Sequence, residues 1–173
     1  TIKSHELISV NDASTDRSRE LLVELDAGHN DIRIINMSRN FGVFPCTFAG
    51  FRHTSGDAVI YMDSDLQDPP ELIPKIIEKW LDGDSIDVVH TVRASRAGEH
   101  WFKLATTKMG YWLLKCISNF DLPAEAGDFK LLSRRAINHL IKFKEKMPYT
   151  RGLVRWVGFN QTSIVYDRDP RFA

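Results

Sequence analysis

The sequence alternates short apolar runs with segments of helical character, and this alternation leaves few folds open to the chain. The first four apolar runs each end near a turn rich in Ser, Thr, Asp, Asn or Gly, and they occupy residues 7–10, 32–35, 58–62 and 86–92. Helix-like segments follow the first three runs, at residues 17–25, 43–51 and 71–81. Nearly continuous apolar strands separated by helices predict an α/β fold with a mostly parallel sheet covered on both faces.

The pattern changes after residue 100, where we expect helices at about 101–116 and 134–141 and strands at 153–157 and 162–166. No repeat or low-complexity tract divides the chain, so we expect one domain over residues 1–173. With 43% hydrophobic residues, such a domain can bury a sizeable core. The sequence starts without Met or a signal-peptide pattern and stops without a helix cap, so we expect a fragment cut at both ends.

Charge and cysteine content exclude several classes of partner. The 23 basic residues balance the 23 acidic ones, so no overall field attracts nucleic acid and we expect none as a partner. Cys46 and Cys116 lack the spacing of a zinc site or a disulfide framework, which favours a reducing cytosol. No apolar run approaches the roughly 20 residues that a membrane-spanning helix needs.

An acidic loop after the third apolar run carries the most informative residues. Asp63 and Asp65 lie two residues apart and project their carboxylates into the same loop. Hard divalent cations bind in this way, with substrate phosphates completing the coordination, and the ion then neutralises charge on a leaving diphosphate. A solvated turn that caps the next helix is the alternative, but Asp68 before Pro69 can supply that cap alone. We therefore expect Asp63 and Asp65 to bind a divalent cation.

A second polar motif, residues 11–16, follows the first strand. An Asp at such a strand end can accept hydrogen bonds from a base or ribose, which makes Asp12 a candidate for nucleotide contact. Helix capping explains Ser14 and Asp16 but not Asp12. Since ligands of open α/β sheets bind beyond the carboxyl ends of the strands, the loops at 11–12, 39–40 and 63–65 are expected to meet in one cleft.

In this order, the motifs resemble the family 2 glycosyltransferases of the GT-A fold. The resemblance is to the branch that contains dolichol-phosphate mannosyltransferases and bacterial polyprenyl-phosphate (bactoprenol) glucosyltransferases. It spans nearly the whole chain and rests on residues 10–16, 38–42, 62–70, 92–99, 126–135 and 151–159. It implies a Rossmann-like three-layer sandwich, here lacking the strand and loop with which the family normally opens.

The resemblance also implies a donor site. Asp12 contacts the nucleotide base, and Arg39, in the second of the converging loops, joins it in the nucleotide-sugar site. Asp63 and Asp65 bind the donor diphosphate and Mg²⁺ or Mn²⁺, and Gln67 assists at the metal. Asp65 is in addition a candidate catalytic residue. These residues stand at the family's motif positions in this sequence.

An acceptor site is implied around Asp128, which in many family members is the general base. A lipid phosphate is already ionised near neutral pH and hardly needs a base, so Asp128 then orients groups; a turn cap after Gly127 is the alternative. Guanidinium forks grip phosphate oxygens, which makes Arg93, Arg96 and Arg151 candidates for phosphate binding. A solvated charged face is the alternative for the arginines.

The partners follow from the resemblance. It implies inverting transfer of a hexose from a nucleotide sugar, UDP-glucose or GDP-mannose, to a polyprenyl or dolichyl phosphate. Many relatives of this branch continue into membrane helices after the point matching residue 173, which places the enzyme on the cytoplasmic face of the membrane. Residues 101–115 fit an amphipathic helix at the membrane interface as well as a helix in the protein core. The chain could also form a homo-oligomer.

Two rival functions remain at this stage. One is a family 2 transferase that acts on a saccharide hydroxyl in cell-surface polysaccharide synthesis, with Asp128 as a true base. The other is a non-catalytic nucleotide-binding domain, which the missing first strand favours. The sequence contains no evident Ser/His/Asp or Cys/His nucleophile arrangement, which fits single-displacement chemistry.

Overall fold

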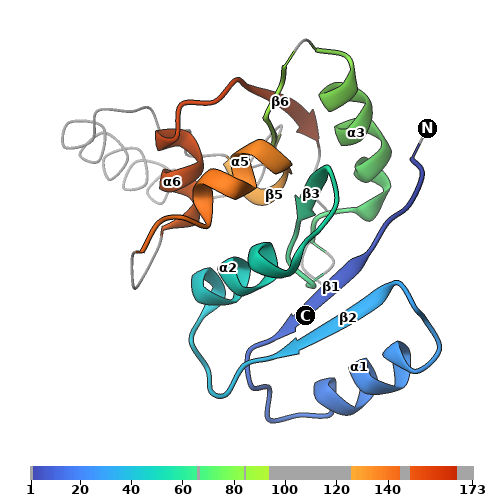
Figure 1. The fold of residues 1–173 in the computed structure, drawn as a ribbon. Helices are drawn as coiled ribbons and strands as arrows, with labels where there is room; N and C mark the ends of the chain where they lie inside the picture. The colour runs from blue at the N-terminus through green and yellow to red at the C-terminus, as the bar shows by residue number, and fades with distance from the viewer. Residues whose placement is uncertain (1, 66, 84, 94–125, 145–148, 167–173) are drawn as a thin grey trace, which may run out of the picture.

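The computed structural model describes residues 2–65, 67–83, 85–93, 126–144 and 149–166. The helix expected at 101–116, the site candidate Arg96 and Cys116 lie outside these residues. In chain order the elements are β1 (Leu7–Asn11), α1 (Ser18–Asp26), β2 (Ile32–Asn36), α2 (Val43–His53), β3 (Ala58–Tyr61), the 3₁₀ turn η1 (Pro70–Leu72), α3 (Ile73–Leu81), β4 (Val88–Arg93), β5 (Ala126–Ser133), α5 (Arg134–Leu140), α6 (Thr150–Trp156) and β6 (Gln161–Tyr166) (Figure 1).

The strands form two sheets, so the expectation of one mostly parallel sheet is wrong for the described residues. β1 and β2 pair in parallel, and the second sheet has the order β3-β5-β4-β6. Only β4 and β6 are parallel there, because β5 runs antiparallel to both of its neighbours. The strand expectation missed β5, since Asp128 and Lys130 interrupt its apolar run.

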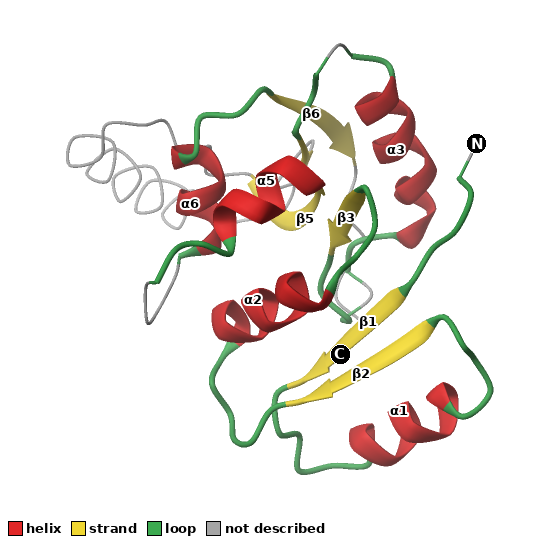
Figure 2. Ribbon diagram, in the orientation of Figure 1, coloured by secondary structure: helices red, strands yellow, loops and turns green. Residues whose placement is uncertain are grey.

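The β1–β2 pair lies apart from the four-stranded sheet. Helix α2 follows β2 in the chain and leads to β3, the edge strand of the second sheet (Figure 2).

Helices cover both faces of the four-stranded sheet, which gives three layers. On one face, Val88 of β4 and Leu132 of β5 pack against Phe51 of α2 and against side chains of α5 and α6. On the other face, Val89 and Phe129 pack against η1 and α3. The alternation of β5 follows from the period of two in a strand, and it sends Asp128, Lys130 and Leu132 to the same face.

Two local expectations are corrected. Residues 153–157 belong mostly to α6 rather than to a strand, because a short apolar run fits either state and Val154 packs into the core with α5. Asp68 does not cap the helix after Pro69. Its side chain is buried instead, with 2% exposure, and accepts a hydrogen bond from the Tyr166 hydroxyl.

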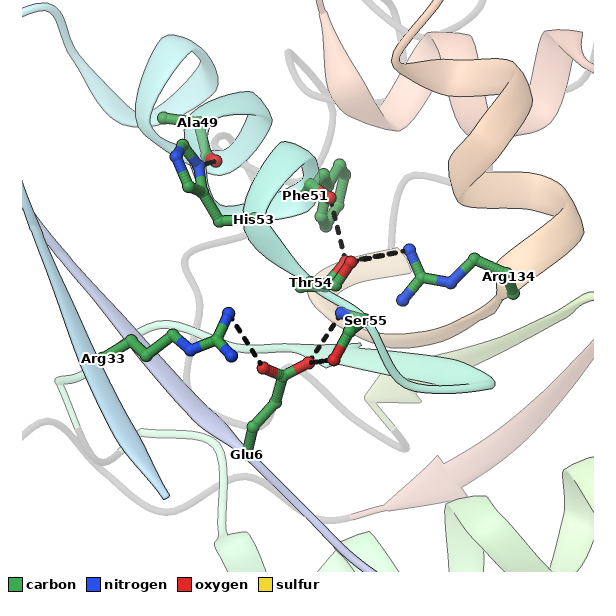
Figure 3. A network of polar contacts seen from close by, with 8 residues as sticks. All are labelled: Glu6, Arg33, Ala49, Phe51, His53, Thr54, Ser55 and Arg134. Carbon is green, nitrogen blue, oxygen red and sulfur yellow. Dashed lines mark hydrogen bonds and ion pairs between the residues drawn. The ribbon is translucent and has the colours of Figure 1, made fainter. Parts of the chain in front are cut away.

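A polar network fixes the loop between α2 and β3 from both sides (Figure 3). Glu6, just before β1, accepts hydrogen bonds from the Ser55 backbone N–H at 2.6 Å and hydroxyl at 2.7 Å, and Arg33 of β2 lies 3.6 Å from its other oxygen. From α5, Arg134 donates to the Thr54 carbonyl at 3.0 Å. The network therefore ties the β1–β2 pair to the loop that leads into the second sheet.

Candidate active site

The first group of candidate residues lies at the carboxyl ends of β1 and β2 and is centred on Asp12. Its two carboxylate oxygens accept hydrogen bonds from the backbone N–H groups of Phe41 and Gly42, both at 2.8 Å. Gly42 has a φ of 88°, a conformation that glycine adopts without strain, and α2 begins directly after it. The Arg39 guanidinium lies 4.0 Å from the centre of the Phe41 ring. Asp12 thus shapes the loop that leads into α2.

Asp12 also has an unusual electrostatic setting. Burial alone would raise the pKa of Asp12, but the hydrogen bonds from the N–H groups of Phe41 and Gly42 lower it by more. The net pKa therefore lies below its usual value. The neighbouring Cys46 thiol is buried, and burial together with Asp12 raises the pKa of Cys46 to about 12. The depressed pKa of Asp12 means that its stabilising effect is present above the unfolded value of about 3.9. That effect is lost as the pH falls through the folded value.

We expect the substitution Asp12→Asn to lower the free energy of unfolding by about 1–3 kcal/mol. The amide keeps one acceptor oxygen but turns an N–H group toward a second backbone donor. Asp16→Asn is the matched control, because Asp16 accepts a hydrogen bond from the Ser18 N–H in an exposed turn; its unfolding midpoint should stay close to that of the parent. Urea unfolding at pH 7 measures both, and equal midpoint shifts would contradict the role of Asp12.

The second group lies where β3 ends and β5 begins. Tyr61 pairs with Lys130 in this antiparallel ladder, so continuing the register by two residues sets Asp63 opposite Asp128. Asp128 is 9% exposed, and both of its oxygens accept hydrogen bonds from Arg151 of α6, the Nε bond measuring 2.9 Å. Antiparallel pairing therefore brings two carboxylates that are 65 positions apart in sequence to the same strand ends.

The acidic surroundings of Asp63 disfavour its charge. Burial raises the pKa of Asp63, and Asp128, Asp65 and Asp68 raise it further, while Arg151 acts in the opposite direction. A half-buried carboxylate with other carboxylates around it is a setting that a bound cation would relieve. The donor set therefore suits a hard divalent cation, which prefers oxygen ligands.

Asp65 is exposed, and Gln67 is half-buried. The Asp65 carboxylate accepts a hydrogen bond from the Gln67 backbone N–H at 3.1 Å. Within the described ranges, no three His, Cys, Asp or Glu side chains gather closely enough to hold a metal ion. A cation at Asp63 and Asp65 would thus need oxygens from other ligands, such as a diphosphate.

Helix α2 carries side chains that approach both groups. Cys46 is adjacent to Asp12, and the next residue, Thr47, lies near the Tyr61 hydroxyl. The Phe44 ring meets Tyr149, at the start of α6, edge to face at a centroid distance of 5.7 Å. The first turns of α2 therefore connect the Asp12 loop with the strand that leads to Asp63 and with the helix that carries Arg151.

The phosphate-binding candidates have separate locations. Arg151 is bound to Asp128, as described above, and its side chain is 38% exposed. Arg93 is the last residue of β4, and Arg96 lies outside the described residues. The structure thus connects Arg151 to the acceptor candidate Asp128, and phosphate binding by any of the three stays a prediction.

A buried polar cluster beneath Asp128 was missed by the sequence analysis. Lys130, Tyr61 and His90 lie opposite one another on β5, β3 and β4. His90 bonds to Gln161 through Nε2 at 2.8 Å, and burial lowers the pKa of His90 to about 4. The signal was present in residues 128–131, where polar and apolar residues alternate with the period of a strand.

Comparison with known proteins agrees with this arrangement. The model of glycosyl transferase family 2 matches residues 1–141. The chain is 46% identical over 173 residues to an uncharacterized glycosyltransferase, YkcC, of Bacillus subtilis (strain 168), with 100% of this chain and 53% of that protein covered. It is 36% identical over 168 residues to the bactoprenol glucosyl transferase of Shigella phage SfX, with 97% and 54% covered. The chain thus spans about half the length of these curated relatives.

The fold also matches solved structures. A mannosyltransferase from Pyrobaculum calidifontis, solved in complex with GDP-Man and Mn²⁺, has a TM-score of 0.58 at 16% identity, with 93% of this chain and 47% of that chain covered. Glucosyl-3-phosphoglycerate synthase from Mycobacterium tuberculosis has a TM-score of 0.57 at 21% identity, with 97% and 61% covered. At these identities the likeness shows an α/β, GT-A-like fold alone. Of the helices described, none combines the length and the apolar character needed to cross a membrane.

Proposed function

Because the chain belongs to glycosyltransferase family 2, we propose that it transfers a hexose with inversion from a nucleotide sugar to a polyprenyl phosphate. The observation that carries the proposal is the pair of carboxylates Asp63 and Asp128 at neighbouring strand ends, with Arg151 bound to the second. The name of the phage SfX relative supports a bactoprenol acceptor, at 36% identity. UDP-glucose is the first candidate donor and GDP-mannose the second.

The donor would bind at the end of β3. Asp63 and Asp65 would hold Mg²⁺ or Mn²⁺ together with the diphosphate, Gln67 assisting, and Asp12 and Arg39 would contact the nucleotide. When bound, the cation supplies positive charge that offsets the charge of the departing diphosphate. The raised pKa of Asp63 supports this assignment, because a site with excess negative charge favours a cation.

The acceptor would meet Asp128. Both oxygens of this carboxylate accept hydrogen bonds from Arg151, which orients it and suits a positioning role. A phosphate oxygen of the lipid attacks the anomeric carbon from the face opposite the diphosphate; a bond to that oxygen forms while the bond to the diphosphate breaks. The phosphate is already ionised near neutral pH, so the step requires no proton acceptor. With a lipid acceptor, the enzyme acts at a membrane, and we place it on the cytoplasmic face.

The test offers acceptors of both classes to the full-length protein. UDP-glucose and GDP-mannose, each with Mn²⁺, are combined with undecaprenyl phosphate or with a saccharide that presents only hydroxyl groups. We expect a charged glycolipid with one donor and no product without the cation. Product from the hydroxyl acceptor alone would make Asp128 a base for polysaccharide synthesis. No product, together with no metal-dependent nucleotide binding by calorimetry, would indicate a non-catalytic domain.

A further inference from the structure

Lys130 is a charged side chain inside the protein, directly beneath the candidate acceptor site. It is 1% exposed and is among the largest fully buried side chains described. It belongs to the middle of the sheet, opposite Tyr61 on one side and His90 on the other. Lysine is almost never fully buried unless its charge is compensated, so this position calls for a counter-charge.

The counter-charge comes from the site itself. Lys130 follows Asp128 by two residues and therefore projects to the same face of β5. Burial lowers the pKa of Lys130 to about 8, and Asp128 and Asp63 oppose this effect, while Arg151 and Arg155 add to it. The side chain therefore stays mainly protonated at pH 7, and Asp128 is the carboxylate with the largest effect on it.

Two cations of different exposure therefore act on Asp128. Arg151 holds its oxygens from the partly exposed side, with 38% of the Arg151 side chain accessible, while Lys130 is enclosed in the sheet layer. Continuing the β3–β5 register two residues past Tyr61 sets a second carboxylate, Asp63, opposite Asp128, and the two charges repel. A fixed cation on the inner side would hold Asp128 in place against this repulsion.

We propose that Lys130 is a positioning residue that holds the Asp128 carboxylate toward the acceptor from inside the sheet. The inference rests on the proposed function. Lys130 is too deep in the sheet layer to contact a substrate, so it acts on the transfer step through Asp128 rather than on donor binding. A lysine with only a structural role would contribute to stability and would leave catalysis unchanged once the protein had folded.

The test compares Lys130→Met with Lys130→Arg. Methionine removes the charge and is one atom shorter than lysine, and Asp128 keeps its hydrogen bonds to Arg151 in this variant. We therefore expect Lys130→Met to fold with a melting temperature close to that of the parent while kcat falls about 30-fold, since a displaced orienting group costs rate. The dissociation constant of UDP with Mn²⁺, measured by calorimetry, should stay within about threefold of the parent value. Lys130→Arg keeps the charge and should retain at least about a third of the parent kcat.

Each alternative outcome would overturn the proposal. If Lys130→Met is unfolded or has unchanged kcat, the residue is structural or dispensable. If UDP affinity with Mn²⁺ falls tenfold or more, Lys130 acts on the donor site. If Lys130→Arg is folded and as slow as Lys130→Met, the charge is not what matters. A parent protein without transferase activity, in contrast, would refute the proposed function itself, so the two failures are distinguishable.

Discussion

Sugar transfer is expected to fall about a thousandfold or more in kcat/KM when Asp63 is replaced by Asn, a loss of about 4 kcal/mol in transition-state stabilisation. The amide has the same shape but removes the negative charge on which a cation and its diphosphate would depend. The initial rate with the donor and acceptor identified by the acceptor screen measures the effect. Asp82→Asn, an exposed carboxylate just after α3, is the matched control and should keep full activity.

The stability of the same variant should move in the opposite direction. The folded pKa of Asp63 lies above its usual value, so ionisation of this group opposes folding, and this cost develops as the pH rises from the unfolded pKa through the folded one. We therefore expect Asp63→Asn to melt at the same or a higher temperature than the parent. Loss of activity without loss of stability is typical of a functional site. A large drop in melting temperature would instead assign Asp63 a structural role.

A chelator provides an independent check on the cation. EDTA should lower the parent rate to the level of Asp63→Asn and leave the residual rate of that variant unchanged, because residues that act as a unit have non-additive effects. Equal fractional inhibition of both proteins would contradict a shared site. Parent activity that persists without a divalent cation would contradict the metal assignment altogether.

Replacing Asp128 by Asn is expected to affect both stability and rate. It breaks the buried pairing with Arg151 and leaves that guanidinium without its bidentate carboxylate partner. Because the Arg151 side chain is 38% exposed, water compensates part of the loss, and we expect a cost of about 2–3 kcal/mol rather than the 3–5 of a fully buried pair. The midpoint of urea unfolding measures this change.

The acceptor determines the effect of Asp128→Asn on rate. With undecaprenyl phosphate we expect kcat to fall about 10-fold to 100-fold, because the variant loses orientation but no required base. With a hydroxyl acceptor, transfer would fall to background, since the base itself would be lost. The double variant Asp128→Asn with Arg151→Gln should recover part of the stability, because it leaves no unpaired guanidinium. A double variant as unstable as the sum of the single ones would mean that the two side chains do not interact.

Local patterns were sufficient for much of the molecule. The strands β1 to β4 and β6 and the helices α1, α2, α3 and α5 were predicted close to their observed bounds, because apolar runs, turn residues and helical periodicity act over a few neighbouring positions. The same patterns placed Asp12 and Asp63 at strand ends, where the structure has them. The family resemblance was confirmed by the comparisons, and the assignments of the individual site residues stay predictions.

Other features depend on contacts between distant residues, which no local pattern contains. The sequence alone indicated the described strands other than β5, and it did not determine that β5 enters antiparallel between β3 and β4. That pairing brings Asp128 beside Asp63 and buries Lys130 beneath them. Strand order and register depend on long-range packing of whole faces. The tertiary structure therefore decided which charged side chains surround each acidic residue, and with them the raised pKa of Asp63.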